Sequence, residues 1–244
     1  HFRTAQSELA VAIDVSQMGR FLHEENFNVS ELDARAVQRP VLIGKAFDPE
    51  LHRSLTREEV GEDFERWDLV FVGAYDKERC ASINRLARRG MSAVVYGNGW
   101  RRSVLAPEVD LRTQQLALDY TRAMRTGKVA LCFLRKINRD RITQRTMEIA
   151  AMARPMLGER TDEHDEHFVD GVEYLGFSND DEIVEKARLL LGDSCLRSRI
   201  AAAGQNRCLT SRYSVADRAA QMLEELTSAV DCRASTTYTK DSRT

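Results

Sequence analysis

The sequence predicts an α/β protein with a Rossmann-like, doubly wound parallel sheet. Two observations carry this prediction. Short apolar runs alternate with longer segments of helical periodicity, and several of the apolar runs end in glycine or in a polar loop, as residues 69–72 do at Gly73. Continuous apolar runs of this length are typical of strands that are covered on both faces. Strands that alternate with helices are joined by right-handed crossovers, so they lie parallel.

The individual elements follow from this alternation. Gly90 ends one helical segment, and Pro155 ends another because proline cannot continue a helix. The chain before residue 40 is less informative, with helical spacing over 8–22 and a short apolar run over 39–44. The predicted strands cover 69–72, 93–96, 129–134, 156–157 and 174–177, and the predicted helices cover 77–89, 116–125, 143–153, 181–191, 194–209 and 215–230.

Composition excludes several classes of protein. The 244 residues are 43% hydrophobic and 30% charged with a net charge of −2, so nothing in the overall charge indicates nucleic acid. No apolar run has the length of a membrane span, and no signal peptide opens the chain. Five scattered cysteines without a C-x-x-C motif indicate buried thiols in a reducing compartment, and hence a cytoplasmic protein.

Two histidines raise the question of a metal. His164 and His167 stand three residues apart in the acidic segment 162–170. That composition favours an exposed acidic turn, with a metal site as the weaker alternative. We therefore predict no metal and no cofactor.

The stretch from 129 to 158 is the most informative part of the chain. A buried strand leads into a polar, cationic loop, and a helix follows. The free N–H groups and the positive end of the helix dipole make such a helix start a natural anion site. In parallel sheets, ligands bind outside the carboxyl ends of the strands, where this loop is expected to lie.

Three side chains of this stretch share a helical face. Arg141, Arg145 and Glu148 are spaced by four and three residues, while Ile149 and Met152 are expected to face a core. One interpretation is a solvated face with ion pairs worth a few tenths of a kcal/mol each. The other is a ligand site, since cations at a helix start are unfavourable unless an anion is bound.

Other nucleotide-binding folds lack their motifs. The loop Gly97-Asn98-Gly99 has no third glycine of a dinucleotide fingerprint, and neither a P-loop nor a G-x-S-x-G elbow occurs. Gly73 and Gly97 both stand at strand ends, as simple turn residues or as residues that let a ligand approach the backbone.

Several ordered motifs between Ala46 and Ala229 resemble one family. The chain is similar to the CgeB-like (spore-maturation type) glycosyltransferases, which belong to the two-domain GT-B class. The motifs are AFDPELH at 46–52, DLVFVGAY at 68–75, VVYGNGW at 94–100, NRDRITQRTMEIAAMARPMLGERTDEHDEHFVDGVEYLGFSNDDEI at 138–183 and IAAAGQNRCLTSRYSVADRAAQML at 200–223.

The resemblance implies a role for each residue of a donor site. Glu148 would accept hydrogen bonds from the ribose hydroxyls of a nucleotide-diphosphate sugar, with UDP as the expected nucleotide, and Arg145 with the amides near Thr146 would hold the diphosphate. Asp140, the expected catalytic acid, stands where the paired-acid motif of the class has its first acid, usually Glu. The opposite wall and the loop would supply the other donor-binding residues, which are Gly73, Tyr75, Tyr96 (stacked on the base), Gly97, Asn138 and Arg141.

The resemblance also divides the chain. Residues 1–62 are expected to be the remnant of an N-terminal acceptor-binding domain with its linker, and 63–230 the nucleotide-sugar-binding domain. The Ser/Thr-rich tail 231–244 lacks apolar periodicity and is expected to be disordered. Three functions stay open: a metal-independent glycosyltransferase with an unknown acceptor, a non-catalytic nucleotide-sugar-binding module, and a doubly wound interaction domain.

Overall fold

The computed structural model describes the backbone of residues 21–23 and 40–238, and side chains over 41–227. The chain divides into two compact units. One is Phe47–Arg212, and the other combines His1–Ala46 with Tyr213–Thr244.

The larger unit is built on a parallel sheet of six strands in the order β5-β4-β3-β6-β7-β8. This order confirms the predicted doubly wound fold, because β3 and β6 lie at the centre and the chain winds outward from them in both directions. The strands are β3 (Trp67–Val72), β4 (Ala93–Tyr96), β5 (Val109–Arg112), β6 (Gly127–Cys132), β7 (Met156–Glu159) and β8 (Leu175–Phe177).

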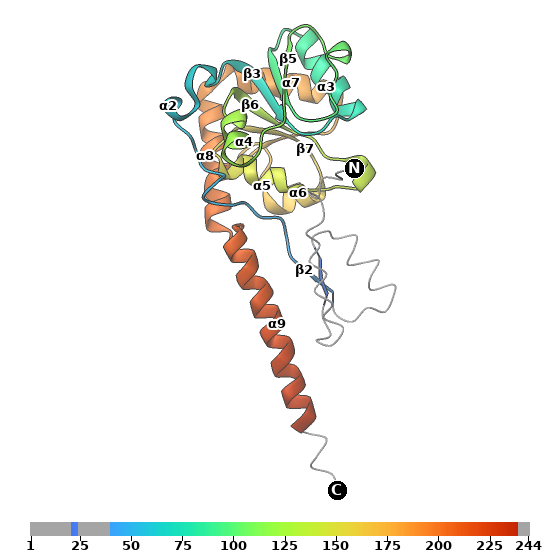
Figure 1. Ribbon diagram of the computed structural model, residues 1–244, viewed down its shortest axis with the longest axis vertical. Helices are drawn as coiled ribbons and strands as arrows, with labels where there is room; N and C mark the ends of the chain where they lie inside the picture. The colour runs from blue at the N-terminus through green and yellow to red at the C-terminus, as the bar shows by residue number, and fades with distance from the viewer. Residues whose placement is uncertain (1–20, 24–39, 239–244) are drawn as a thin grey trace. The chain divides into compact units, whose positions relative to one another are not determined.

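Helices cover both faces of the sheet (Figure 1). On one face lie α3 (Lys77–Arg88) and α7 (Asp180–Gly192), and on the other lie α4 (Ala117–Met124) and α5 (Gln144–Ala151), with α8 (Ser194–Thr210) packed against α5. Because strand side chains alternate, the core is double: one set of strand residues packs on α3 and α7, and the other on α4 and α5.

The structure adds elements that the sequence did not predict. The strand β5 lies at the sheet edge, and only its first residue, Val109, is buried, so its apolar pattern is too weak to read. The other additions are short: α2 (Arg57–Val60), α6 (Asp162–His167) and the 3-10 turns Gly61–Asp63, Arg102–Val104 and Lys136–Asn138.

The prediction of an exposed acidic turn at His164 is wrong. The segment is the helix α6, whose N-cap Thr161 accepts a hydrogen bond from the His164 amide, and the His164 side chain is 0% exposed. Its ring Nε2 lies 2.9 Å from Thr146 Oγ1 on α5. Among the described residues, no three His, Cys, Asp or Glu side chains gather as metal ligands do.

The smaller unit contains β1 (Phe21–His23), which pairs in parallel with β2 (Pro40–Leu42), and the helix α9 (Val215–Tyr238). The helix runs through 231–238, part of the segment that we expected to be disordered. No glycine or proline follows Val215, so the sequence contains none of the usual helix breakers within α9. Residues 239–244 and most of the predicted helix over 8–22 lie outside the described residues. No helix in the described part of the chain has the length and apolar character to cross a membrane.

Candidate functional site

The loops after β3 and β4 touch each other at the carboxyl edge of the sheet. The Gly73 amide donates to the Tyr96 carbonyl at 2.8 Å. A Cβ at Gly97 would lie 2.0 Å from the Gly73 carbonyl oxygen, and Gly97 has a φ of 153°. Only glycine fits at Gly97, because any side chain would force the two loops apart. Both predicted glycines therefore shape this edge.

Two aromatic rings stand beside Gly73. The indole Nε1 of Trp100 donates to the Gly73 carbonyl at 2.8 Å, and the half-buried Tyr75 meets the Trp100 ring edge-on with 5.3 Å between the centroids. Tyr75 thus lies where the predicted wall is, and Trp100, which sequence reasoning missed, holds the wall to the sheet.

Tyr96 is turned into the core. Its side chain is 3% exposed, its hydroxyl donates to Thr126 Oγ1 at 3.4 Å, and the Arg112 guanidinium lies 5.9 Å from its ring centroid. Alternation along β4 sends the last side chain of this strand to the face that α4 covers. The ring has no open face on which a nucleotide base could stack.

A cation without an acidic partner stands at the start of α5. A Cβ at Gly73 would lie 2.9 Å from a terminal guanidinium nitrogen of Arg145, so this side chain reaches across from α5 to the end of β3. Burial works to lower the pKa of Arg145, but Tyr120 and Glu148 outweigh it, and the pKa lies above its usual value. The Arg145 Nε is buried without a hydrogen-bond partner.

Two further arginines converge on the same place. Arg79 of α3 donates to the carbonyls of Ala74 at 3.5 Å and Phe133 at 3.3 Å, which follow β3 and β6. Burial and the charges of Arg145 and Arg135 lower the pKa of Arg79. Arg79 and Arg135 also have a buried Nε without a partner. None of the three forms an ion pair with any acid that the structure describes.

We call Arg79, Arg135 and Arg145 the arginine cluster. Arg79 is buried and Arg135 and Arg145 are half-buried, and in each of them the Nε is buried without a hydrogen-bond partner. Like charges this close repel one another, and a buried donor without an acceptor is costly, unless an anion is bound. Sequence reasoning selected Arg145 alone. Arg135 belongs to the cationic loop after the buried strand, and Arg79 was not singled out.

Glu148 lies in a partly buried polar contact rather than on a solvated face. Its side chain is 14% exposed, its Oε2 accepts from the Tyr120 hydroxyl at 2.7 Å, and its Oε1 lies 3.8 Å from His52 Nε2. The guanidinium of Arg145 is 5.7 Å from the Tyr120 ring centroid. Glu148, Arg145 and Tyr120 are therefore neighbours, and Ile149 and Met152 are buried as predicted.

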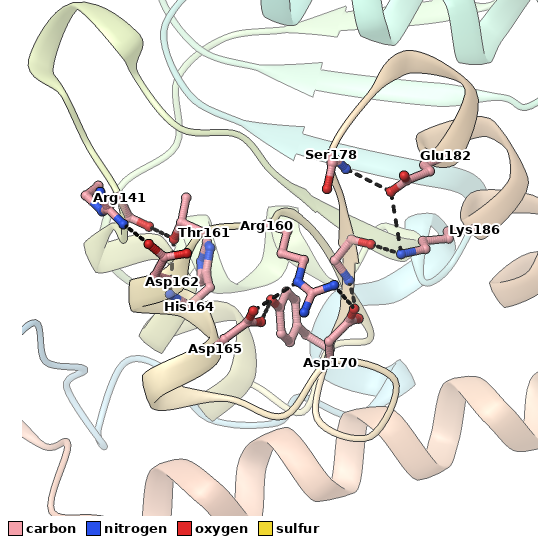
Figure 2. A network of polar contacts seen from close by, with 12 residues as sticks. Arg141, Arg160, Thr161, Asp162, His164, Asp165, Asp170, Ser178, Glu182 and Lys186 are labelled. Atoms are coloured by element: carbon pink, nitrogen blue, oxygen red, sulfur yellow. Dashed lines mark hydrogen bonds and ion pairs between the residues drawn. The ribbon is translucent and has the colours of Figure 1, made fainter.

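Arg141 does not share the face of Arg145 and Glu148. The helix α5 begins only at Gln144, so Arg141 remains in the loop, where its guanidinium pairs with Asp162 at 2.7 Å (Figure 2). Thr161 also donates its hydroxyl hydrogen to the Arg141 carbonyl. The predicted stripe of three charges is thus reduced to two.

The remaining predicted residues fall into different environments. Asn138 is exposed at the loop tip, and Asp140 is half-buried and accepts from the Arg135 amide at 3.2 Å. Thr146 is 0% exposed and its amide donates to the Thr143 carbonyl, so Thr146 holds the start of α5 from inside.

One carboxylate at this edge escaped sequence reasoning. Glu159 ends β7, is half-buried, and accepts from the Leu134 amide at 3.3 Å. Burial raises the pKa of Glu159. A lone acid after a short strand gives no sequence signal, because only the pairing of β6 with β7 brings it beside the loop that follows β6.

A six-stranded parallel sheet with glycine-ended strands, a cationic helix start and a carboxylate at one edge defines a domain with a Rossmann-type fold. Solved structures share this fold. HepE from Anabaena, determined with UDP and glucose, is 13% identical with a TM-score of 0.69, over 86% of this chain and 63% of HepE. Sucrose-phosphate synthase from Thermosynechococcus elongatus is 11% identical with a TM-score of 0.67, over 87% and 59%.

A smaller relative matches almost entirely. The C-terminal domain of a glycosyl transferase group 1 family protein, LpcC from Francisella tularensis, is 15% identical with a TM-score of 0.52, over 69% of this chain and 99% of that domain. No curated protein matches the chain.

The family model of glycosyl transferase-like proteins matches residues 78–224. The chain belongs to this glycosyl transferase-like family, and its fold is that of a GT-B glycosyltransferase domain.

Proposed function

We propose that this chain is the donor-binding half of a GT-B glycosyltransferase, of the CgeB-like type, that moves a sugar from a UDP-sugar to an acceptor. The observation that carries the proposal is the arginine cluster, in which each of three neighbouring arginines has a buried Nε without a hydrogen-bond partner and forms no ion pair with an acid that the structure describes. A diphosphate supplies the missing charge, and guanidinium groups bind phosphate oxygens in a fixed fork geometry.

The proposal gives a role to the residues at the carboxyl edge of the sheet. The arginine cluster and the positive end of the α5 dipole hold the diphosphate and stabilise the charge that develops on UDP as the glycosidic bond breaks. These cations take the part that a metal plays elsewhere, so the enzyme works without a bound metal. Glu148 accepts from the ribose hydroxyls, and Gly73, Gly97 and Tyr75 form the opposite wall. We leave Tyr96 out of the donor set because its ring is buried.

Asp140 remains the proposed acid beside the donor sugar, with Asn138 and Arg141 in the same loop. The Asp140 carboxylate accepts from the Arg135 amide, which ties it to a member of the arginine cluster. In this proposal residues 63–230 bind the donor, and residues 1–62 belong to the acceptor-binding side of the enzyme, apart from the segment from Phe47 on, which lies in the same compact unit as the donor site. Three buried free thiols, Cys80, Cys132 and Cys208, suit a protein of the cytoplasm.

The chain spans 63% of the length of HepE. A binding module that holds a nucleotide sugar without transferring it is the second candidate. It keeps the arginine cluster but makes no use of Asp140. Asp140→Asn separates the two: a transferase loses turnover of the UDP-sugar while its UDP affinity stays within about threefold, whereas a binding module shows no turnover in either form.

The experiment that tests the donor site is thermal unfolding with UDP, with uridine as the matched ligand that lacks the diphosphate. We expect UDP at about 100 times its dissociation constant to stabilise the fold by about 2.7 kcal/mol. Uridine at the same concentration should stabilise it far less, because it cannot engage the arginine cluster. An unchanged melting temperature with millimolar UDP would contradict the proposal, and so would equal shifts with both ligands.

A further inference from the structure

Both oxygens of the Glu148 carboxylate face side chains from distant parts of the sequence. Oε2 accepts from the hydroxyl of Tyr120 on α4 at 2.7 Å, and Oε1 lies 3.8 Å from Nε2 of His52 in the loop before α2. The first contact is a short hydrogen bond to a charged acceptor, which is the stronger kind. The second is longer than a hydrogen bond and acts through charge and dipole.

Tyr120 is built to donate to this carboxylate. Its side chain is 7% exposed, and burial together with the charge of Glu148 raises the pKa of Tyr120 well above its usual value. The phenol therefore keeps its proton at any physiological pH. Its hydroxyl hydrogen points at Glu148 Oε2, so the ring holds one carboxylate oxygen in a single position.

His52 faces the other oxygen in a defined tautomer. The Asp48 amide donates to His52 Nδ1 at 3.0 Å, so the ring hydrogen of neutral His52 sits on Nε2, the nitrogen that faces Glu148. The ring also meets Tyr120 edge-on, with 5.8 Å between centroids. The two rings support each other, and neither can turn away from Glu148 without breaking a contact with the rest of the chain.

We propose that Tyr120 and His52 are positioning residues that hold the Glu148 carboxylate for the ribose, and that discrimination between ribose and deoxyribose depends on them. This inference rests on the proposed donor site. An ionised carboxylate offers about four acceptor positions. One is taken by Tyr120 and one faces His52, which leaves the outer lone pairs for the ribose hydroxyls. A carboxylate held in advance loses less freedom when the ligand binds.

The experiment compares the dissociation constants of UDP and 2′-deoxy-UDP by calorimetry in the wild type and in Tyr120→Phe. In the wild type we expect UDP to bind about tenfold more tightly, which corresponds to about 1.4 kcal/mol. Tyr120→Phe removes the donor and leaves the ring, so UDP should weaken about tenfold while 2′-deoxy-UDP changes by less than about twofold. The two ligands should then bind almost alike.

Tyr96→Phe is the matched control. Tyr96 is also a buried tyrosine on this face of the sheet, but its hydroxyl donates to Thr126 instead of Glu148. We expect this variant to keep the wild-type ratio of the two dissociation constants. A ratio that falls equally in both variants would show a general loss of packing and would overturn the inference.

His52→Asn tests the second contact without depending on Tyr120. Asparagine offers an acceptor near the position of Nδ1 for the Asp48 amide but has no donor that reaches Glu148. We expect a smaller fall in the ratio, about threefold, in keeping with the longer distance. A wild type that binds no UDP would overturn the donor site itself. A wild type that prefers UDP, with Tyr120→Phe and His52→Asn both keeping that preference, would overturn only the positioning roles.

Discussion

The helix α5 differs from α6 and α7 in how its first turn is charged, although all three follow strands that end at one edge of the sheet. The first turn of α6 contains Asp162, Glu163 and Asp165, and that of α7 contains Asp180, Asp181 and Glu182. The first turn of α5 contains no acid and includes Arg145. Acids at a helix start neutralise the positive end of the dipole, and the first turn of α5 has no acid that could do so.

The cations of the two regions differ in the same way. Around α6, Arg141 pairs with Asp162 at 2.7 Å and Arg160 with Asp165 at 2.9 Å, so the charges are balanced within the protein (Figure 2). Arg145 at α5 has no such pair among the residues described. Around α6 the acidic and basic side chains of the protein neutralise one another. At the start of α5 the arginine charge has no ion-pair partner among the residues described, so an anionic ligand can neutralise it.

The largest expected effect is a loss of folding stability at low pH, caused by His164 of α6, whose buried ring contacts Thr146 of α5. Burial lowers the pKa of His164 to about 4, below its usual 6.5. Above pH 6.5 the His164 ring is neutral in both the folded and the unfolded chain. Below it the unfolded chain binds the proton first, so stability falls as the pH drops towards 4, by about 3 kcal/mol in total. His164→Asn, measured by urea unfolding between pH 7 and 4, should remove this part of the fall.

His167→Asn is the control for that series, because His167 lies on the same helix and is only half-buried. The charge of His167 is a smaller cause of the lowered pKa of His164 than burial, so the curve of stability against pH should keep most of the wild-type fall. If the His164→Asn curve ran parallel to the wild type as well, the buried ring would not be what couples α6 to α5 as the pH falls.

The next effect contrasts the two arginines directly. Arg145→Ala should weaken UDP by about 2 kcal/mol, the contribution of a charged hydrogen bond, and uridine by much less. Arg141→Ala removes an exposed guanidinium that already has an acidic partner, so UDP affinity should change by less than about threefold. Calorimetry with both ligands measures this. If both variants lost the same amount of UDP affinity, the proposal that the anion binds at the start of α5 and not at α6 would be contradicted.

The smallest effect belongs to α7. The Asn179 side chain accepts from the amides of Asp181 and Glu182 and so caps this helix. Asn179→Ala should lower stability by about 1 kcal/mol and leave UDP affinity unchanged, because the start of α7 is satisfied by the chain itself. Thermal unfolding and calorimetry on the same sample check both parts, and a loss of UDP binding would place the ligand at α7.

The sequence by itself determined the class of fold, and it singled out the residues from which a donor site is proposed. The strand over 93–96 has the predicted bounds, and the helix predicted over 77–89 ends within one residue of the predicted position, because apolar runs, Gly90 and helical periodicity are local signals. Gly97 was also readable, since a glycine that follows a buried strand signals a turn or a close approach. Arg145 and Glu148 stood out because cations at a helix start contradict the dipole.

Only the tertiary structure decided which side chains meet there. Arg79 of α3 and Arg145 of α5 are brought together by the pairing of β3 with β6, and Tyr120 and His52 reach Glu148 from α4 and from the loop before α2. The same order of strands buries Tyr96 and His164, which sequence reasoning had placed in a ligand site and on the surface. Periodicity reports which residues are buried within one element, whereas a site forms between elements, through crossovers that no local pattern records.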